Sequence, residues 1–353
     1  MGTIVKPPPL NVEKSIVENA LELTPLTDIG PVSHHPNGAS CIFLTASDGP
    51  KDIFTNTRPL WHPPGARGVY GGAVIAQCLS AAQRTVHHSF SVHSMHCYFV
   101  LAGNPAVPIV YHVERVREGR SYATRTVQAR QRGKPIFTTT MSFMKEGAGA
   151  GGKPVRHAVE MPEGLEGPWE EDASKGGAVE SWKLGLVNED SPDLSSRKIR
   201  RWVRARGKIS SEGGHQAHLS ALAYMSDSYF IGTVARIHKL DRGAGWEERK
   251  LPSATEKPPQ SSTEEETGEE RPEISMMVSL DHTIYFHSPR DFRADEWFLT
   301  EAESPWAGDG RGVVVQKIWT QGGMLVATCF QEGVVRTKPD APRPPPKEKE
   351  SKL

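Results

Sequence analysis

The chain has 353 residues, and its 42 lysine and arginine residues balance its 42 aspartate and glutamate residues. This length is enough for two domains of ordinary size, each with a buried core of its own. The balanced charge favours neither nucleic acid nor an anionic membrane as a partner. The sequence contains no run of about 18 apolar residues, so no stable membrane insertion is expected.

The N-terminal region shows no apolar stretch of the kind found in secretory signals, so secretion is not expected. Residues 1–10 are rich in proline and predict a disordered leader. Residues 11–23 predict a short amphipathic helix, because their apolar positions have helical spacing. The cysteines are widely spread and form no C-x-x-C pair, which argues against a disulfide framework or a zinc site. They are Cys41, Cys78, Cys97 and Cys329.

The first informative segment is a helix within residues 68–86. From Ala73 onward nearly every position is apolar or small, and a helix without a polar face is a buried helix. Gly71 and Gly72 precede these positions, and they let another group approach the backbone amides at the helix start.

Four strand-like segments follow, at residues 93–103, 108–119, 121–133 and 135–146. Their β-branched and aromatic residues alternate with a period of two, and glycine-containing turns separate them. A buried helix followed by an antiparallel meander predicts a sheet wrapped around a helix. We expect this first domain to span residues 11–146.

The same order of elements returns in the second half of the chain. Residues 147–196 are rich in Gly, Pro and Glu and predict a linker. Residues 215–230 then predict a second helix, and four strands are expected between residues 279 and 336. We expect the second domain to span residues 197–338, with an acidic, disordered insertion at residues 241–273.

Residues as well as elements repeat between the halves, which predicts an internal duplication. A histidine and an aromatic pair begin each meander: His96, Tyr98 and Phe99 in the first, and His282, Tyr285 and Phe286 in the second. A Gly-Arg pair opens the third strand of both meanders. The alternative is that antiparallel meanders share such patterns without a duplication.

The last segment, residues 339–353, is a proline-rich and charged tail whose end should be exposed. It ends in Ser351, Lys352 and Leu353, the address that the peroxisomal import receptor reads. The sequence therefore predicts a protein of the peroxisomal matrix, with that receptor as a partner.

Several strings, in the same order along the chain, resemble those of the acyl-CoA thioesterase II family, including its peroxisomal branch. They are YGGAVIAQ, HSMHCYFVLAGN, VERVREGRSY, GKPIF, SLDHTIYFH, ESPWAG and QEGVVR. The likeness covers residues 11–338 apart from the linker and the insertion. It implies an α+β double hot-dog fold, in which two tandem antiparallel sheets each wrap around a central helix.

The resemblance also implies the reaction and its residues. The substrate would be a fatty acyl-CoA, hydrolysed to free fatty acid and CoA without a cofactor or a metal. The family holds a water with an Asp, a Ser or Thr and a Gln, and the matching positions are Asp227, Ser279 and Gln331. Asp227 would accept a proton from the water, and the other two would orient it. Taken singly, each residue has a structural alternative, as a helix cap, a strand start or a surface residue.

Other polar residues compete with this assignment. His93 and His96 are three residues apart on a strand and should face opposite sides, which is poor for holding a metal. We expect structural hydrogen bonds for most histidines, with His96 as a candidate supporting residue. Asp281 is expected to share a strand face with Ser279 and could be mistaken for the base.

Three other functions stay open at this point. A hot-dog enoyl-CoA hydratase fits peroxisomes, but its Gly-Asp-x-Asn-Pro-(aliphatic)-His string does not occur here. A non-catalytic acyl-CoA-binding protein would bind without turnover, and a partner-binding module would act through the acidic insertion. The oligomeric state is not determined by the sequence, although hot-dog sheets commonly pair, and we expect a homo-oligomer.

Overall fold

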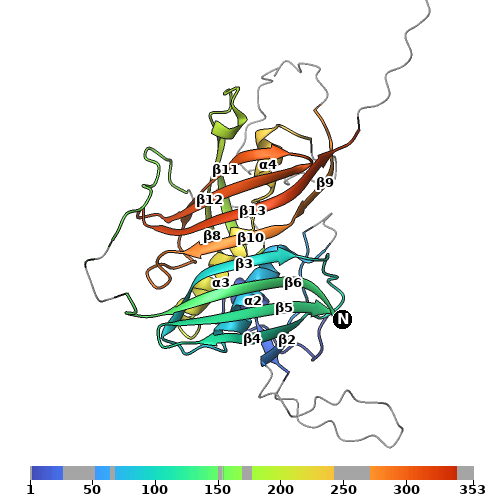
Figure 1. Ribbon diagram of the computed structural model, residues 1–353, viewed down its shortest axis with the longest axis vertical. Coiled ribbons are helices and arrows are strands. Elements are labelled where there is room, and N and C mark those ends of the chain that lie inside the picture. The colour runs from blue at the N-terminus through green and yellow to red at the C-terminus, as the bar shows by residue number, and fades with distance from the viewer. Residues whose placement is uncertain are drawn as a thin grey trace, which may run out of the picture.

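The structure is a computed structural model that describes residues 2–26, 52–63, 68–149, 153, 155–168, 177–241 and 271–339. Cys41, most of the predicted acidic insertion and the C-terminal Ser351, Lys352 and Leu353 lie outside these residues. Figure 1 shows one large sheet with helices packed behind its central strands. None of the described helices has the length and apolarity to cross a bilayer.

The first half of the chain contributes six of the described strands. They are β1 (Leu23–Pro25), β2 (Asp52–Asn56), β3 (Phe90–Phe99), β4 (Val110–Glu118), β5 (Tyr122–Gln131) and β6 (Lys134–Lys145). The second half contributes β7 (Val179–Val187), β8 (Lys198–Ala205), β9 (Ile274–Ser279), β10 (Asp281–Phe286), β11 (Phe298–Gly308), β12 (Arg311–Thr320) and β13 (Leu325–Thr337). Every strand predicted from the sequence is among them.

Among the described residues these strands form one 13-stranded sheet, in the order β1-β2-β4-β5-β6-β3-β10-β13-β12-β11-β8-β7, with β9 paired to β13. The order in one half mirrors that in the other, and the halves meet where β3 pairs with β10. Cys97 lies opposite His282 at this joint. The predicted double hot-dog fold is confirmed, and its two sheets are joined edge to edge.

Two helices of 13 residues each, α2 (Gly71–Gln83) and α3 (Gly214–Ser226), lie side by side inside the curve of the sheet. They run in opposite directions, since Gly72 at the start of α2 contacts Tyr224 near the end of α3. Their apolar residues form one core with the inward side chains of both halves. A shorter helix, α4 (Gly232–Ile237), follows α3 and was not expected from the sequence.

The predicted leader at residues 1–10 is ordered against the first half, so the expectation of disorder was wrong for the described residues 2–10. Asn56 Nδ2 donates to the Gly2 carbonyl at 2.7 Å, and Arg58 Nη1 donates to the Pro8 carbonyl at 2.9 Å. An extended proline-rich chain leaves its carbonyls free to accept such bonds. The helix that follows is also shorter than predicted: α1 (Ile16–Ala20) begins at a capping box.

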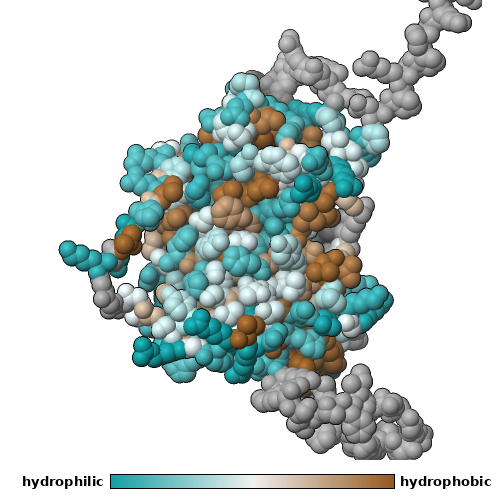
Figure 2. All heavy atoms as spheres, in the orientation of Figure 1, coloured by the Kyte–Doolittle hydropathy of each residue, from teal (hydrophilic) through white to brown (hydrophobic). Residues whose placement is uncertain are grey.

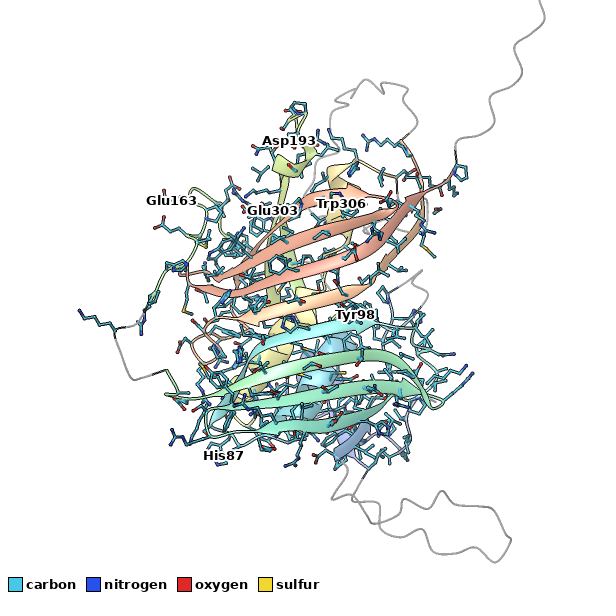
Figure 3. All side chains as sticks on the ribbon, in the orientation of Figure 1. His87, Tyr98, Glu163, Asp193, Glu303 and Trp306 are labelled. Carbon is cyan, nitrogen blue, oxygen red and sulfur yellow. The ribbon has the colours of Figure 1, made fainter. Side chains whose placement is uncertain are left out.

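The predicted linker at residues 147–196 contains structure that the sequence analysis did not anticipate. Strand β7 and a 3-10 turn, η2 (Leu194–Ser196), both lie in it. Residues 155–168 cross the outer face of the second half, where Trp202 and Trp319 each donate their indole N–H to a backbone carbonyl of this segment. Glu163, labelled in Figure 3, marks this segment. The composition, rich in glycine and proline, therefore did not reveal the edge strand β7 or the segment that covers the outer face of the second half.

The outer face of the central strands is not covered by other described elements. Figure 2 shows this face as a mosaic of hydrophilic and hydrophobic patches. Tyr98, Tyr285 and Phe330 are 62%, 41% and 40% exposed there. Tyr98 is labelled in Figure 3 on β3, at the joint between the halves.

Candidate functional site

Asp227 lies directly after the last residue of α3, where the start of α2 packs against it. Its Oδ1 accepts a hydrogen bond from Gln331 Nε2 at 2.8 Å, and its carboxylate also accepts the backbone N–H of Gly72. Only 9% of its side chain is exposed. The carboxylate is therefore held between the end of one buried helix, the start of the other and the inner face of the sheet.

Two glycines allow this close approach, as the sequence suggested. A Cβ atom on Gly71 would lie 2.7 Å from Asp227 Oδ2, and one on Gly72 would lie 2.4 Å from the Tyr224 carbonyl oxygen. Atoms in a close-packed interior cannot tolerate such distances. A side chain at either position would displace the carboxylate or separate the helices.

The surroundings of Asp227 leave its proton affinity near that of a histidine. Burial raises the pKa of Asp227 to about 6, although hydrogen bonds from Gln331 and from the Gly72 N–H oppose the shift. The positive end of the α2 dipole also favours the ionised form. Asp227 is therefore charged at neutral pH and has a proton affinity suited to a general base.

Gln331 on β13 faces Asp227 and is 1% exposed. Its Nε2 donates to Asp227 Oδ1 and also lies 3.1 Å from His282 Nδ1. Its carbonyl oxygen, Oε1, has no hydrogen-bond partner among the described residues. A buried amide oxygen without a partner indicates a place for a bound water or a ligand.

His282 on β10 is completely buried, and it precedes the pair formed by Thr283 and Phe330, next to Gln331. Its Nε2 lies 3.0 Å from Ser226 Oγ, and its Nδ1 is 3.9 Å from Asp227 Oδ1. Burial lowers the pKa of His282 to about 3, so the imidazole is neutral at physiological pH.

Ser279 ends β9 and pairs with Gly333, which shares the inward face of β13 with Gln331. Paired residues of antiparallel strands point to the same side of the sheet, so Ser279 also faces inward. Its partner Gly333 is two residues from Gln331 along β13. Within the described part of the chain its hydroxyl forms no hydrogen bond to Asp227 or Gln331. The structure thus joins Asp227 and Gln331 directly, whereas Ser279 is related to Gln331 only through the pairing of β9 with β13.

The expectation that Asp281 shares a strand face with Ser279 was wrong. The pairing with β13 shifts by one residue between Ser279–Gly333 and Thr283–Phe330, so Leu280 is an extra residue in the manner of a β-bulge. Asp281 therefore lies opposite the exposed Tyr98 and accepts the backbone N–H of Glu332 at 2.7 Å. The same extra residue turns His282 inward.

Three other histidines in or next to the strands make structural hydrogen bonds. His93, His96 and His287 contact the hydroxyls of Ser142, Thr283 and Thr328. A register shift between Val92 and Ser94 upsets the simple alternation from which opposite faces were expected for His93 and His96. His96 is exposed and does not contact Asp227, whereas the unpredicted His282 does lie at the site.

The sequence carried one signal that could have identified His282. It alternates with Ile284 and Phe286, so it should share their buried face, and a buried histidine needs polar partners. Ser226 gave no such signal, because it precedes Asp227 inside an apolar helix. Both contacts depend on the packing of α3 against β10, which local patterns do not reveal.

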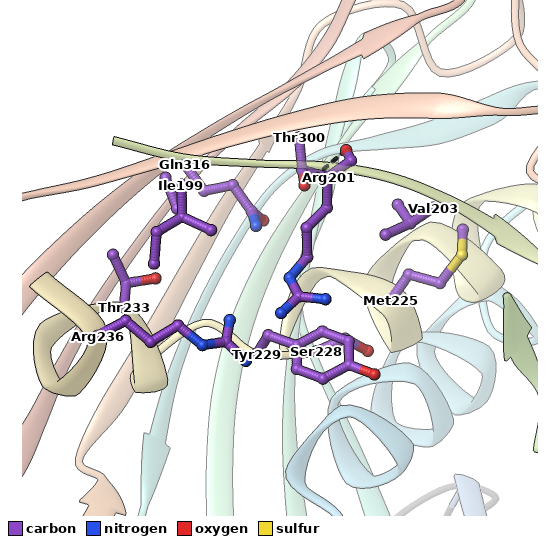
Figure 4. A pocket seen from close by; sticks show the side chains of 11 residues that line it. Ile199, Arg201, Val203, Met225, Ser228, Tyr229, Thr233, Arg236, Thr300 and Gln316 are labelled. Atoms are coloured by element: carbon purple, nitrogen blue, oxygen red, sulfur yellow. Dashed lines mark hydrogen bonds between the residues drawn. The ribbon is translucent and has the colours of Figure 1, made fainter. Parts of the chain in front are cut away.

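A small cavity adjoins the end of α3, with a volume of about 10 Å³, enough for one water molecule. Figure 4 shows Arg201 and Arg236 converging on Tyr229 inside it. Their guanidinium carbons lie 4.0 Å and 5.5 Å from the centre of the Tyr229 ring. Tyr229 has a φ of 62°, so the chain makes a left-handed turn two residues after Asp227. This cluster fixes the segment that leaves the site.

The duplicated position in the first half has a different character. Arg84 directly follows the last residue of α2, as Asp227 follows that of α3, and Arg84 Nη1 donates to the Leu23 carbonyl at 2.9 Å. At the start of α3 the nearby carboxylate is Glu18, which accepts hydrogen bonds from the hydroxyl and the N–H of Ser210. These bonds and those from Ser15 lower the pKa of Glu18, although burial opposes them. Glu18 therefore lacks the raised proton affinity of Asp227.

Comparison with known families gives two matches that together cover most of the chain. Residues 58–144 match the acyl-CoA thioesterase N-terminal domain, and residues 152–335 match the acyl-CoA thioesterase C-terminal domain.

Individual relatives agree with these matches. The chain is 36% identical to human acyl-coenzyme A thioesterase 8 over 317 residues, which cover 82% of this chain and 86% of the relative. It is 24% identical to the peroxisomal acyl-coenzyme A thioester hydrolase 1 of Saccharomyces cerevisiae, over 77% of this chain and 87% of that protein. The crystal structure of acyl-CoA thioesterase II TesB2 from Mycobacterium marinum superimposes with a TM-score of 0.59 at 29% identity, covering 93% of this chain and 99% of that chain.

Proposed function

Since this chain belongs to the acyl-CoA thioesterase II family and is an acyl-CoA thioester hydrolase, we propose that Asp227 and Gln331 hold and activate its hydrolytic water, with Ser279 as the third group. The observation that supports this proposal best is the buried Asp227 carboxylate, with a pKa of about 6, bonded to a Gln331 side chain whose oxygen has no partner among the described residues.

The proposed reaction needs a single base. Asp227 accepts one proton from a water molecule while the water oxygen attacks the thioester carbonyl carbon. The carbonyl oxygen becomes an oxyanion, and its collapse to a carboxylic acid breaks the carbon–sulfur bond. The CoA thiolate takes the proton from Asp227, so the products are a fatty acid and CoA and the base is restored.

The start of α2 supplies the electrostatic part of this proposal. Its first backbone N–H groups have no carbonyl partners within the helix, and they give this end of the helix a partial positive charge. Negative charge that develops on the carbonyl oxygen beside Asp227 would be stabilised by that end.

Ser279 has the weakest structural support of the three residues. It faces the same side as Gln331 but forms no hydrogen bond with either partner in the described residues, so it would join them only through the water. We expect Ser279→Ala to lower kcat by about tenfold, and Ser279→Thr, which keeps the hydroxyl, to retain most of the activity.

The proposal is tested by measuring CoA release with a thiol reagent, over a series of saturated acyl-CoA chain lengths. We expect Asp227→Asn and Gln331→Ala each to reduce kcat by about 10²–10⁴-fold without loss of folding. Release of CoA from saturated substrates also distinguishes hydrolysis from enoyl-CoA hydration. Wild-type turnover by Asp227→Asn would eliminate the proposed base.

We also propose that the protein acts in the peroxisomal matrix. The sequence ends in Ser351, Lys352 and Leu353, and one relative is named as a peroxisomal enzyme. A fluorescent protein fused to the N-terminus should collect in peroxisomes, and removal of the last three residues should release it to the cytosol. Peroxisomal collection of the truncated fusion would show that these residues are not the address.

A further inference from the structure

We propose that His282 is a positioning residue for hydrolysis, whose neutral imidazole fixes the orientation of the Gln331 carboxamide. The inference rests on the proposed function of Asp227 and Gln331. It adds that the water is oriented through a chain of hydrogen bonds that begins in the backbone of α3.

The direction of this chain follows from its first link. The Ser226 hydroxyl donates its single proton to the Ala223 carbonyl, at a distance of 2.9 Å. Ser226 Oγ can then only accept from His282 Nε2, 3.0 Å away. His282 therefore carries its proton on Nε2, and its Nδ1 is an acceptor.

The second link determines how Gln331 is oriented. An amide nitrogen has two protons, and the two acceptors within reach of Gln331 Nε2 are His282 Nδ1 and Asp227 Oδ1. Both protons are used, so Oε1 must point away from them. This oxygen is the buried one that has no partner among the described residues.

This orientation matters for the water. A water molecule that donates one proton to the Asp227 carboxylate needs an acceptor for its other proton, and Gln331 Oε1 is such an acceptor. Its lone pair is then directed away from both groups. In the flipped amide, Oε1 would face the Asp227 carboxylate, acceptor against acceptor, and the nitrogen would face the water.

His282 is not itself the base in this arrangement. Both of its nitrogens are occupied, one by Ser226 and the other by Gln331, and Phe230 packs its ring against the imidazole at a centroid distance of 5.4 Å. Protonation of His282 Nδ1 would place its N–H against the N–H of Gln331 Nε2, donor against donor. His282 therefore contributes by orienting Gln331, not by accepting a proton from the water.

Two substitutions of His282 separate the positioning role from others. His282→Asn places an amide oxygen near the position of Nδ1 and keeps an acceptor for Gln331, whereas His282→Phe removes it. We expect kcat to fall about 100-fold in His282→Phe and less than about tenfold in His282→Asn, with KM within about threefold of wild type in both. His287→Phe, directly after the same strand and bonded to Thr328, is the matched control and should keep wild-type kcat.

The pH profile distinguishes positioning from direct catalysis. The plot of kcat/KM against pH for His282→Asn should still show a break near the pH at which the wild-type plot does, because Asp227 remains the base. Equal, complete loss in His282→Asn and His282→Phe, or disappearance of that break, would identify His282 as the base and overturn the proposal. Wild-type kcat in His282→Phe would also overturn the positioning role of His282. If Asp227→Asn is inactive in the same experiment, the proposed function of Asp227 is still supported.

A measurement on the wild-type protein does not depend on the variants' folding. In ¹⁵N-histidine-labelled protein, the His282 signals, assigned by their loss in His282→Asn or by their contact with Phe230, should show a protonated Nε2 and an unprotonated Nδ1 from pH 5 to 8. A protonated Nδ1, or titration within this range, would contradict the proposed chain of hydrogen bonds.

Discussion

Asp227 and His282 are two buried titratable side chains whose nearest polar atoms are 3.9 Å apart, and burial moves their pKa values in opposite directions. Each shift favours the neutral form, because a charge is costly in a low-dielectric interior. The pair therefore carries at most one charge at physiological pH, and that charge is on Asp227. Gln331 bonds to both residues, which couples its orientation to them without adding a charge.

The pKa of Asp227 predicts the pH dependence of the reaction. Because the ionised form is the proposed base, kcat/KM should rise about tenfold per pH unit below about pH 6 and reach a plateau above it. Steady-state rates between pH 4.5 and 8.5, in buffers of constant ionic strength, test this. A break in kcat/KM below pH 5 would show that burial does not control the base.

The same shift predicts a conflict between stability and activity. The pKa of Asp227 is higher in the folded protein than the unfolded value of 3.8, so stability is lost as the pH rises from about 4 to 6. Asp227→Asn removes this loss and should stabilise the protein by up to about 3 kcal/mol at pH 7, with little effect at pH 4. Urea unfolding at both pH values measures the difference, and an equal effect at pH 4 and 7 would refute the explanation.

At the scale of elements, the site depends on the contact between two helix ends. The end of α3 presents Asp227, and the start of α2 presents an amide to it, across two glycines that have no room for a side chain. β9 and β10 are the second pair of elements that matter. The extra residue Leu280 between them lets both Ser279 and His282 face the inner side of the sheet.

Gly71→Ala tests this helix contact. The added methyl group would lie 2.7 Å from Asp227 Oδ2 and 2.8 Å from the Phe99 ring, so we expect a loss of about 1–3 kcal/mol of stability and a fall in kcat of at least about tenfold. Gly149→Ala is the control, since a Cβ there meets no atom within 4 Å. Thermal unfolding and kcat of both variants give the comparison, and unchanged kcat in Gly71→Ala would show that the carboxylate tolerates displacement.

The buried helices and the strands were predictable because their patterns are local. Helix α2 is apolar or small at nearly every position, and β5 alternates over its entire length, so each follows from a single window of residues. The shift at Leu280 was not predictable, because one extra residue leaves the composition of a strand unchanged but reverses which side chains point inward. The family resemblance suggested Asp227 and Gln331 as partners, whereas their contact with His282 depends on packing between distant segments.

At the scale of the whole molecule, the duplication produced two similar helix contacts with different chemistry. Arg84 occupies the position that corresponds to Asp227, and Glu18 approaches the start of α3 with four hydrogen bonds that hold it ionised. Burial therefore raises the proton affinity of the carboxylate at one contact, whereas hydrogen bonds lower it at the other. We infer that the contact at Glu18 stabilises the fold, while the contact at Asp227 holds the proposed base.

Glu18→Gln tests this division of roles. Since hydrogen bonding lowers the pKa of Glu18, its contribution to stability is present at neutral pH and is lost as the pH falls through the folded-state value. We expect the variant to keep wild-type kcat, and to lower Tm by a few degrees at pH 7, corresponding to roughly 1 kcal/mol for this partly exposed group, and by less at pH 4. A large fall in kcat would show that the first contact takes part in the reaction.

The antiparallel arrangement of α2 and α3 has a consequence for the gene. On the proposed mechanism neither copy of the repeat can act as a catalyst by itself, because the carboxylate belongs to one copy and the N–H that donates to it belongs to the other. Selection for turnover will therefore preserve residues in the copy that carries no base. Larger residues at Gly71 and Gly72 should then be as harmful to turnover as changes to Asp227, although neither glycine has a side chain that could react.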